Sequence, residues 1–95
     1  MQEITLGVLN EYIKFNNLTI VLFFKKDSII GEYLICVCKK IEKLFNCHIF
    51  QIEMEEESSK GVFPRLSVYF KSKILETLYG FNNFNKTSSF VKKYL

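Results

Sequence analysis

The spacing of hydrophobic residues changes several times along the chain between a strand-like and a helical pattern. Residues 18–24 (LTIVLFF) form a continuous apolar, β-branched and aromatic run, which is typical of a strand buried on both faces of a sheet. Residues 48–54 alternate and predict a second strand. Between these runs, apolar residues recur every three or four positions and predict a helix that begins after Asp27 or Ser28 and ends near Asn46. Its predicted inward residues are Leu34, Val37, Cys38, Ile41, Leu44 and Phe45.

The flanking segments predict the remaining elements. Residues 3–6 favour a short strand, and helical spacing follows up to Asn16-Asn17, with Val8, Leu9, Tyr12, Ile13 and Phe15 as its apolar positions. Residues 66–70 and 74–79 are strand-like runs separated by a gap of hairpin length. Residues 80–85 predict a loop and 86–95 a helix. This order predicts parallel pairing with right-handed crossovers first, and an antiparallel pair at the end.

Length and composition limit the possible classes of protein. Ninety-five residues, with 48% hydrophobic and 24% charged, predict one folded domain spanning residues 1–95. The net charge is only +3, and the lysines occur as dispersed pairs, so we expect no nucleic-acid partner. The longest nearly uncharged stretch, residues 15–24, has about half the length that a membrane-spanning helix needs, and no signal peptide is recognisable. We therefore expect no membrane association and a cytoplasmic location.

The three cysteines are too few for a disulfide scaffold, and we expect them to remain reduced. Cys36, Cys38, Cys47 and His48 are residue types that bind metals. However, two cysteines two positions apart on a helix point in divergent directions, whereas structural zinc sites use converging ligands. We therefore expect no metal site, and no motif in the chain indicates a cofactor.

Several landmarks, taken in this order and spacing, resemble the thioredoxin family over nearly the whole chain. Phe23-Phe24 resembles the end of the family's central strand, Phe63-Pro64 its hydrophobic residue and cis-proline, and Tyr79-Gly80 the end of its fifth strand. The resemblance implies an α/β three-layer sandwich, a βαβ unit followed by ββα, with a mixed five-stranded sheet. The polar segment 55–61 predicts a solvated loop. Because residues 54–64 are shorter than the family norm by about one helical turn, we expect a shortened or absent third helix.

The resemblance also implies that the family's redox chemistry is missing. The family's Cys-x-x-Cys falls on the segment Ser28-Ile29-Ile30-Gly31, so neither redox position carries sulfur. The buried acid of the family falls on Leu22, and the lysine paired with it falls on Gln51. Cys38 would lie about 15 Å further along the helix, where we expect an inert buried thiol.

What the resemblance retains is the family's recognition surface. In the family, the residue before the cis-proline offers backbone hydrogen bonds to an extended polypeptide beside the start of the second helix. We therefore expect a redox-inactive module, not an enzyme, that binds a protein or extended peptide. The expected binding residues are Ser28, Ile29, Ile30, Phe63, Pro64 and Gly80.

Other interpretations remain open from the sequence. Ile29, Ile30 and Phe63 could pack inward instead of forming a surface. An enzyme or redox sensor would use Cys36 or Cys47 as a single thiol, since Cys36 would lie nearer solvent and close to Lys40. An assembly subunit would pair through the strand at 74–79 or through the N-terminal strand. The sequence identifies neither the partner nor the oligomeric state.

Overall fold

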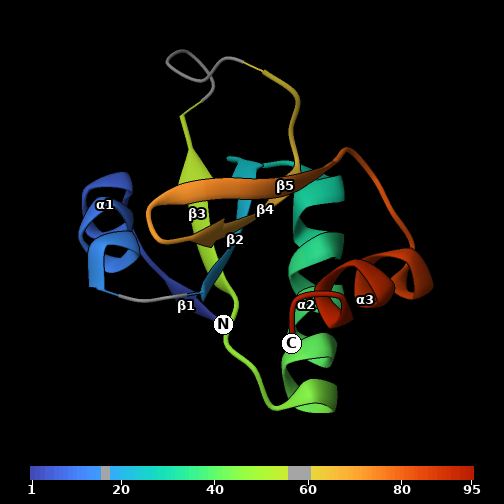
Figure 1. Ribbon diagram of the computed structural model, residues 1–95. Helices are drawn as coiled ribbons and strands as arrows, with labels where there is room; N and C mark the ends of the chain where they lie inside the picture. The colour runs from blue at the N-terminus through green and yellow to red at the C-terminus, as the bar shows by residue number, and fades with distance from the viewer. Residues whose placement is uncertain (16–17, 56–60) are drawn as a thin grey trace.

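The computed structural model describes residues 1–15, 18–55 and 61–95 and has five strands and three helices within them (Figure 1). The sheet has the order β1-β3-β2-β4-β5, in which β3 pairs in parallel with β1 and β2, and β4 pairs antiparallel with β2 and β5. The mixed five-stranded sheet and the α/β class are therefore confirmed. In chain order the elements are β1 (Gln2–Glu3), α1 (Leu6–Phe15), β2 (Leu18–Lys25), α2 (Ile29–Phe45), β3 (Phe50–Met54), β4 (Arg65–Phe70), β5 (Lys73–Tyr79) and α3 (Phe84–Lys92).

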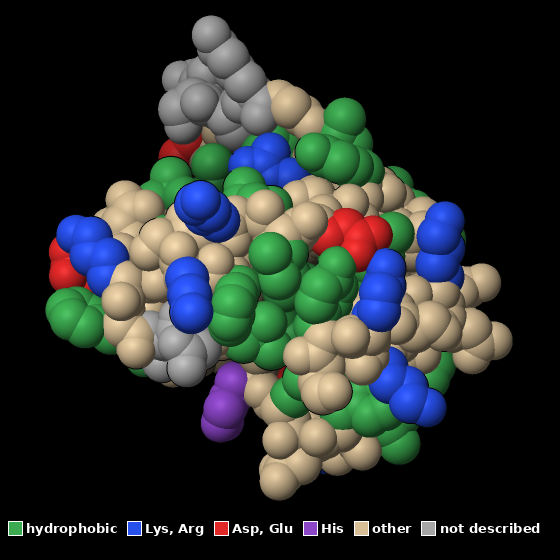
Figure 2. All heavy atoms as spheres, viewed as in Figure 1, with side chains coloured by type: hydrophobic (Ala, Val, Ile, Leu, Met, Phe, Trp, Pro, Cys, Tyr) green, Lys and Arg blue, Asp and Glu red, His purple; other side chains and the backbone are tan. Residues whose placement is uncertain are grey.

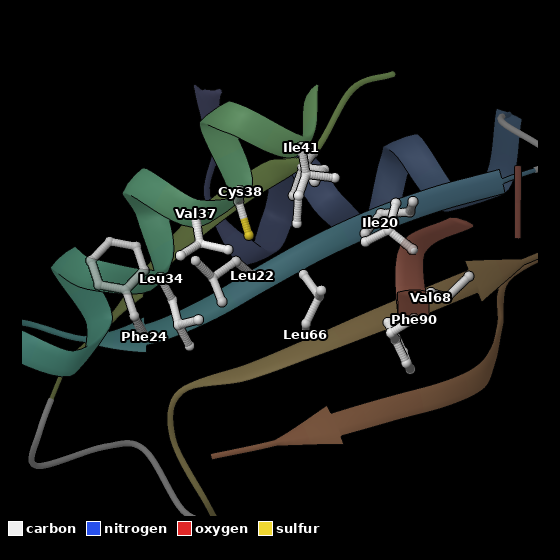
Figure 3. Packing of buried hydrophobic residues seen from close by; sticks show 12 residues of the cluster. Ile20, Leu22, Phe24, Leu34, Val37, Cys38, Ile41, Leu66, Val68 and Phe90 are labelled. Atoms are coloured by element: carbon white, nitrogen blue, oxygen red, sulfur yellow. The ribbon is translucent and has the colours of Figure 1, made fainter. Parts of the chain in front are cut away.

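The central strand β2 divides the hydrophobic core into two clusters. Because successive side chains of a strand point to opposite faces, alternate residues of β2 belong to different clusters. Leu22 and its neighbours pack against α2 and α3, while Val21 and Phe23 pack on the α1 side. Figure 3 shows Leu34 and Cys38 of α2 pointing toward β2. Helices thus cover both faces of the sheet, which gives the three-layer arrangement that the resemblance implies.

Local hydrogen bonds explain where the structure departs from the predicted element bounds. The Thr5 hydroxyl accepts a hydrogen bond from the Val8 amide at 3.2 Å, and α1 begins at Leu6. Because this cap ends the extended segment early, β1 comprises only two residues. Asn83 caps α3 in the same way, through a 2.8 Å bond from the Lys86 amide, so that helix begins two residues before the predicted start.

Three residues that the helical spacing placed inward are exposed instead. Val8 and Phe15 of α1 and Leu44 of α2 are exposed by 42%, 81% and 62% respectively. Phe15 and Leu44 lie at or near the ends of their helices, beyond the part of each helix that the sheet covers. Apolar periodicity identified these helices correctly but not the length of the face that each one buries.

Strand β5 forms one edge of the sheet and follows a two-residue turn. The turn residues Lys71 and Ser72 both have positive φ values, 51° and 69°, as tight hairpin turns require. A register shift between Val68 and Tyr69 interrupts its pairing with β4. Ile74 and Leu75 at the start of β5 are exposed by 57% and 50%. Hydrophobic side chains accordingly gather over this strand, with basic side chains around them (Figure 2).

Glu76 on β5 contacts two residues that follow α3, Lys93 and Tyr94. Its carboxylate accepts a 2.8 Å hydrogen bond from the Lys93 ammonium and another from the Tyr94 hydroxyl. These two donors hold the pKa of Glu76 below its usual range. The contact fixes the last turn of α3 and the residues after it on the sheet.

Two expectations about the connection between β3 and β4 fall partly outside the described residues. Residues 56–60, which belong to the predicted solvated loop, are not described. Residues 55 and 61–64, which are described, form no helix.

No helix in the described ranges is long and apolar enough to cross a membrane.

Candidate functional site

The topology brings the start of α2, the start of β4 and the end of β5 to the same end of the sheet (Figure 1). Phe23, near the end of β2, pairs with Arg65 at the start of β4, and Arg65 pairs with Tyr79 at the end of β5. Helix α2 begins four residues after β2 ends. All six residues predicted to bind a partner belong to these three chain segments.

The first turn of α2 is closely packed against β2. The Ser28 side chain caps the helix by accepting a 3.0 Å hydrogen bond from the Gly31 amide. A Cβ placed on Gly31 would lie 3.0 Å from Cβ of Phe24 and 3.3 Å from Cβ of Ser28. Glycine therefore lets the helix approach the strand here, and it brings positions 28 and 31 next to one another.

A hydrogen bond between loops links the other two predicted segments. The Phe63-Pro64 peptide bond is cis, and the Pro64 carbonyl accepts a 2.8 Å bond from the Gly80 amide. Gly80 has a φ of 77°, which favours glycine. The buried Asn82 side chain donates to the carbonyls of Tyr79 and Gly80, at 3.1 and 3.2 Å, and holds the loop after β5 in place.

Large apolar side chains are exposed at this end of the molecule, and Figure 2 shows hydrophobic side chains near the top of the view. Ile29 is 84% exposed and Ile30 46%, whereas Phe63 is half-buried. The centroid of the Phe81 ring lies 5.3 Å from that of the Tyr33 ring, so the loop after β5 packs on α2. We call this surface the apolar tip and define it as Ile29, Ile30, Tyr33, Val62, Phe63, Tyr79 and Phe81.

Two cations that the sequence analysis did not single out lie against Phe63. The Arg65 guanidinium is 4.6 Å from the centroid of the Phe63 ring and 4.7 Å from that of Phe23. The Lys25 ammonium is 5.7 Å from the centroid of the Phe63 ring. Arg65 is the only arginine of the sequence and follows Phe63-Pro64 directly, but a single residue forms no pattern that would have identified it.

Cys38 and Cys47 are poor nucleophiles, and Cys36 lines a pocket with Tyr33 of the apolar tip. Burial, followed by the nearby Glu42 carboxylate, raises the pKa of Cys38 to about 12. The same two causes raise the pKa of Cys47, which is partly exposed. Cys36 is exposed on α2, about 12 Å from Ser28 along the helix axis. All three are free thiols.

Alkylation by iodoacetamide at pH 7 is expected to distinguish the three thiols. Cys36 should react first because it is exposed. The Cys38 thiol is almost entirely protonated at pH 7, so it should react at least about a hundred-fold more slowly than an ordinary exposed thiol. Peptide mass spectrometry after timed quenching measures each rate, and guanidinium chloride should make the three rates similar. Rapid labelling of Cys47 in the folded chain would contradict its raised pKa and favour the single-thiol enzyme.

A pocket of about 370 Å³ lies beside the first residues of β2 and the residues that lead into β3. It is at the end of the sheet opposite the apolar tip. Cys47, His48 and Glu42 are among its lining residues. The Glu42 carboxylate is already engaged, since it accepts a 2.8 Å bond from the Ile49 amide and lies 2.9 Å from the amino group of Met1. Over the described residues, no group of three or more His, Cys, Asp or Glu side chains could hold a metal ion.

Comparison with solved structures identifies the fold. The chain superposes on a thioredoxin from Plasmodium falciparum with a TM-score of 0.82 at 18% identity, covering 100% of both chains. For thioredoxin f2 from Chlamydomonas reinhardtii the TM-score is also 0.82, at 10% identity, over 99% of this chain and 95% of that one. A thioredoxin pre-protein from Schistosoma mansoni gives 0.73 at 17% identity over both full lengths. No protein-family model and no curated protein matches the sequence. The chain therefore has the thioredoxin fold.

Proposed function

We propose that this chain is a redox-inactive domain of the thioredoxin fold that binds a protein partner as an extended peptide at the apolar tip. The observation that carries the proposal is the exposure of two adjacent isoleucines, Ile29 at 84% and Ile30 at 46%, on the first turn of α2. Burying Ile29 on a partner would stabilise a complex by about 1.5–3 kcal/mol, and burying the half-exposed Ile30 by about half as much. Exposed apolar side chains gathered at one place commonly mark an interaction site.

Backbone groups at the same end of the sheet as the isoleucines support an extended ligand. Phe63 and Pro64 precede β4 and are held by the hydrogen bond from Gly80. Main-chain hydrogen bonds to such a segment would give affinity, and the apolar side chains of the tip would select the residues of the peptide. Ser28 would contribute by fixing the helix turn that presents Ile29 and Ile30.

The absence of sulfur at positions 28 and 31 supports the redox-inactive part of the proposal. Helix α2 starts with Ser28-Ile29-Ile30-Gly31, and Cys36 and Cys38 are separated by one residue further along the helix. Leu22 and Gln51, which correspond by resemblance to the family's acid and lysine, are register partners on β2 and β3. Neither side chain can transfer a proton at neutral pH. Three free thiols are compatible with the reducing conditions of the cytoplasm.

Replacing Ile29 and Ile30 together by aspartate is expected to weaken peptide binding by at least about ten-fold, because two apolar contacts are lost and two charges must be desolvated. Heptapeptides selected from a random phage-displayed library against the full chain provide the probe. Fluorescence anisotropy of a synthesised, labelled peptide measures the dissociation constant. Circular dichroism should remain unchanged, since both side chains are exposed.

The matched control is the double variant Ile74→Asp with Leu75→Asp on β5. These residues have similar chemistry and similar exposure, 57% and 50%, but lie at the opposite end of β5 from Tyr79. The control carries the same change in charge and should retain peptide affinity within about two-fold. Equal loss in both variants, or no loss in the Ile29 and Ile30 variant, would remove the apolar tip as the binding site.

A further inference from the structure

We propose that Arg65 is a specificity residue that selects partner peptides carrying an aspartate or glutamate beside their apolar residues. This inference rests on the proposed peptide-binding function and names the chemical class of the partner. Its basis is a preorganised cation with unused hydrogen-bonding capacity at the edge of the apolar tip.

Two aromatic rings hold the guanidinium of Arg65 in position. The centroids of the Phe23 and Phe63 rings lie 4.7 and 4.6 Å from the guanidinium carbon. Phe23 is almost completely buried and belongs to the core, so it provides a rigid support. Aromatic faces attract a cation but cannot accept its five N–H donors in directional bonds. The guanidinium is therefore oriented, but its donors are not used by these rings.

Arg65 is also electrically uncompensated within the part of the chain that the structure describes. The ion pairs there join Met1 to Glu42, Lys14 to Glu11 and Lys93 to Glu76, and none of them includes Arg65. On one side the guanidinium faces Gly61, where a Cβ would lie 3.1 Å from Nη1. Gly61 therefore packs its backbone close to Nη1 without a side chain that could bond to it, and Arg65 as a whole is half-buried.

A second cation adds to the positive charge around Phe63. The Lys25 ammonium lies 5.7 Å from the Phe63 centroid, so the same ring contacts both Lys25 and Arg65. No ion pair among the described residues includes Lys25. The start of α2, which carries the positive end of the helix dipole, follows β2 after a short turn. Charge complementarity therefore favours a negatively charged partner at this edge of the tip.

The planar guanidinium fork fits a carboxylate with two parallel hydrogen bonds. A peptide that follows Phe63 and Pro64 passes the ring on which the guanidinium rests, because the two groups are in direct contact. Its apolar side chains would cover Ile29 and Ile30, and one carboxylate would bind Arg65. The partner class is thus an extended apolar peptide with an acidic residue, and not an apolar peptide alone.

Phage selection with random heptapeptides tests this assignment. The wild-type chain is expected to enrich Asp or Glu next to apolar positions, and Arg65→Met should lose that enrichment while still selecting apolar residues. For one selected peptide, exchanging its Glu for Gln should weaken binding to the wild-type chain by about ten-fold and binding to Arg65→Met by less than about two-fold. Methionine is chosen because its flexible apolar side chain can still cover the two phenylalanine rings.

The outcomes separate the specificity of Arg65 from the binding site itself. The uncharged double variant Ile29→Ser with Ile30→Ser tests whether the selected peptides bind at the apolar tip. If those peptides need Ile29 and Ile30 but show no enrichment of acidic residues, the role of Arg65 is overturned and the proposed function stands. If no peptide is enriched at all, both fail. The Glu-to-Gln exchange in the peptide needs no protein variant, so it tests the preference for an acidic residue even where Arg65→Met is unstable, and a peptide whose binding does not weaken would overturn the role of Arg65.

Discussion

A chain carrying Ser28→Cys and Gly31→Cys is expected to form a disulfide between the two new residues. A Cβ on Gly31 lies 3.3 Å from Cβ of Ser28, close to the separation of about 3.5–4.5 Å found in disulfides. The start of a helix also lowers the pKa of a cysteine, which favours the reactive thiolate. The reduced variant has five thiols, the three natural ones and the two new ones, and mild oxidation should leave three that react with a thiol reagent.

Two controls separate geometry from strain in this experiment. The Cβ at position 31 would lie 3.0 Å from Cβ of Phe24, so Gly31→Ala alone should destabilise the fold by about 1–3 kcal/mol. Ser28→Cys with Ile30→Cys places the two thiols at the wrong spacing and should keep all five thiols after the same oxidation. Failure of the 28 and 31 pair to close would contradict the equivalence of these positions with a thioredoxin dithiol.

The same variant tests whether the natural chain is redox-inactive. Reduction of insulin disulfides by dithiothreitol should be faster with the Ser28→Cys and Gly31→Cys chain than with the wild type, which should match the rate without protein. The gain should be limited, because Leu22 supplies no carboxylate for proton transfer. A wild-type chain as fast as the variant would show that one of its own cysteines is catalytic.

Replacing Leu22 by aspartate is expected to give the largest loss of stability among the changes considered. Leu22 is 1% exposed and packs in the cluster between the sheet and α2 (Figure 3). Leu22→Ala should cost about 2–5 kcal/mol through the cavity that it leaves. Leu22→Asp loses the same contacts and also buries a carboxyl group, so its cost at pH 7 should be greater, enough to unfold much of a domain whose total stability is about 5–15 kcal/mol.

The pH dependence of the two variants distinguishes a buried charge from a cavity. Burial raises the pKa of an aspartate above its unfolded value of about 3.9. The folded state then binds more protons than the unfolded state between these two pKa values, and stability falls as the pH rises through that interval. Urea unfolding followed by circular dichroism should therefore show Leu22→Asp approaching Leu22→Ala near pH 4. A constant difference from pH 4 to pH 8 would mean that position 22 accommodates a charge.

The sequence was sufficient to predict the order of elements and the sheet, because its apolar runs have distinct periods. Residues 18–24 could only be a doubly buried strand, and the structure places that strand at the centre. The ends of the elements were less predictable. Thr5 and Asn83 cap their helices through side-chain hydrogen bonds, and several neighbouring residues could have done so equally well. The register shift between Val68 and Tyr69 depends on pairing with β5, which periodicity does not encode.

The candidate site was predictable in position but not in character. The resemblance brought Ser28, Phe63 and Gly80 to one place, and the topology does so as well. The sequence left the exposure of Ile30 open, because this residue continues the helical spacing of the buried Leu34 and Val37. Arg65 was missed for a related reason. A single arginine carries no pattern, and its stacking on Phe23 and Phe63 depends on tertiary structure.

The open edge of β5 has a consequence for behaviour at high concentration. Ile74 and Leu75 would favour pairing of two copies edge to edge, but Lys71 and Lys73 stand at the same end of the strand. Pairing two such edges in parallel would place like charges side by side, and lysines are a common protection of sheet edges against aggregation. We therefore expect the double variant Lys71→Gln with Lys73→Gln to associate at a lower protein concentration than the wild type, with an unchanged core.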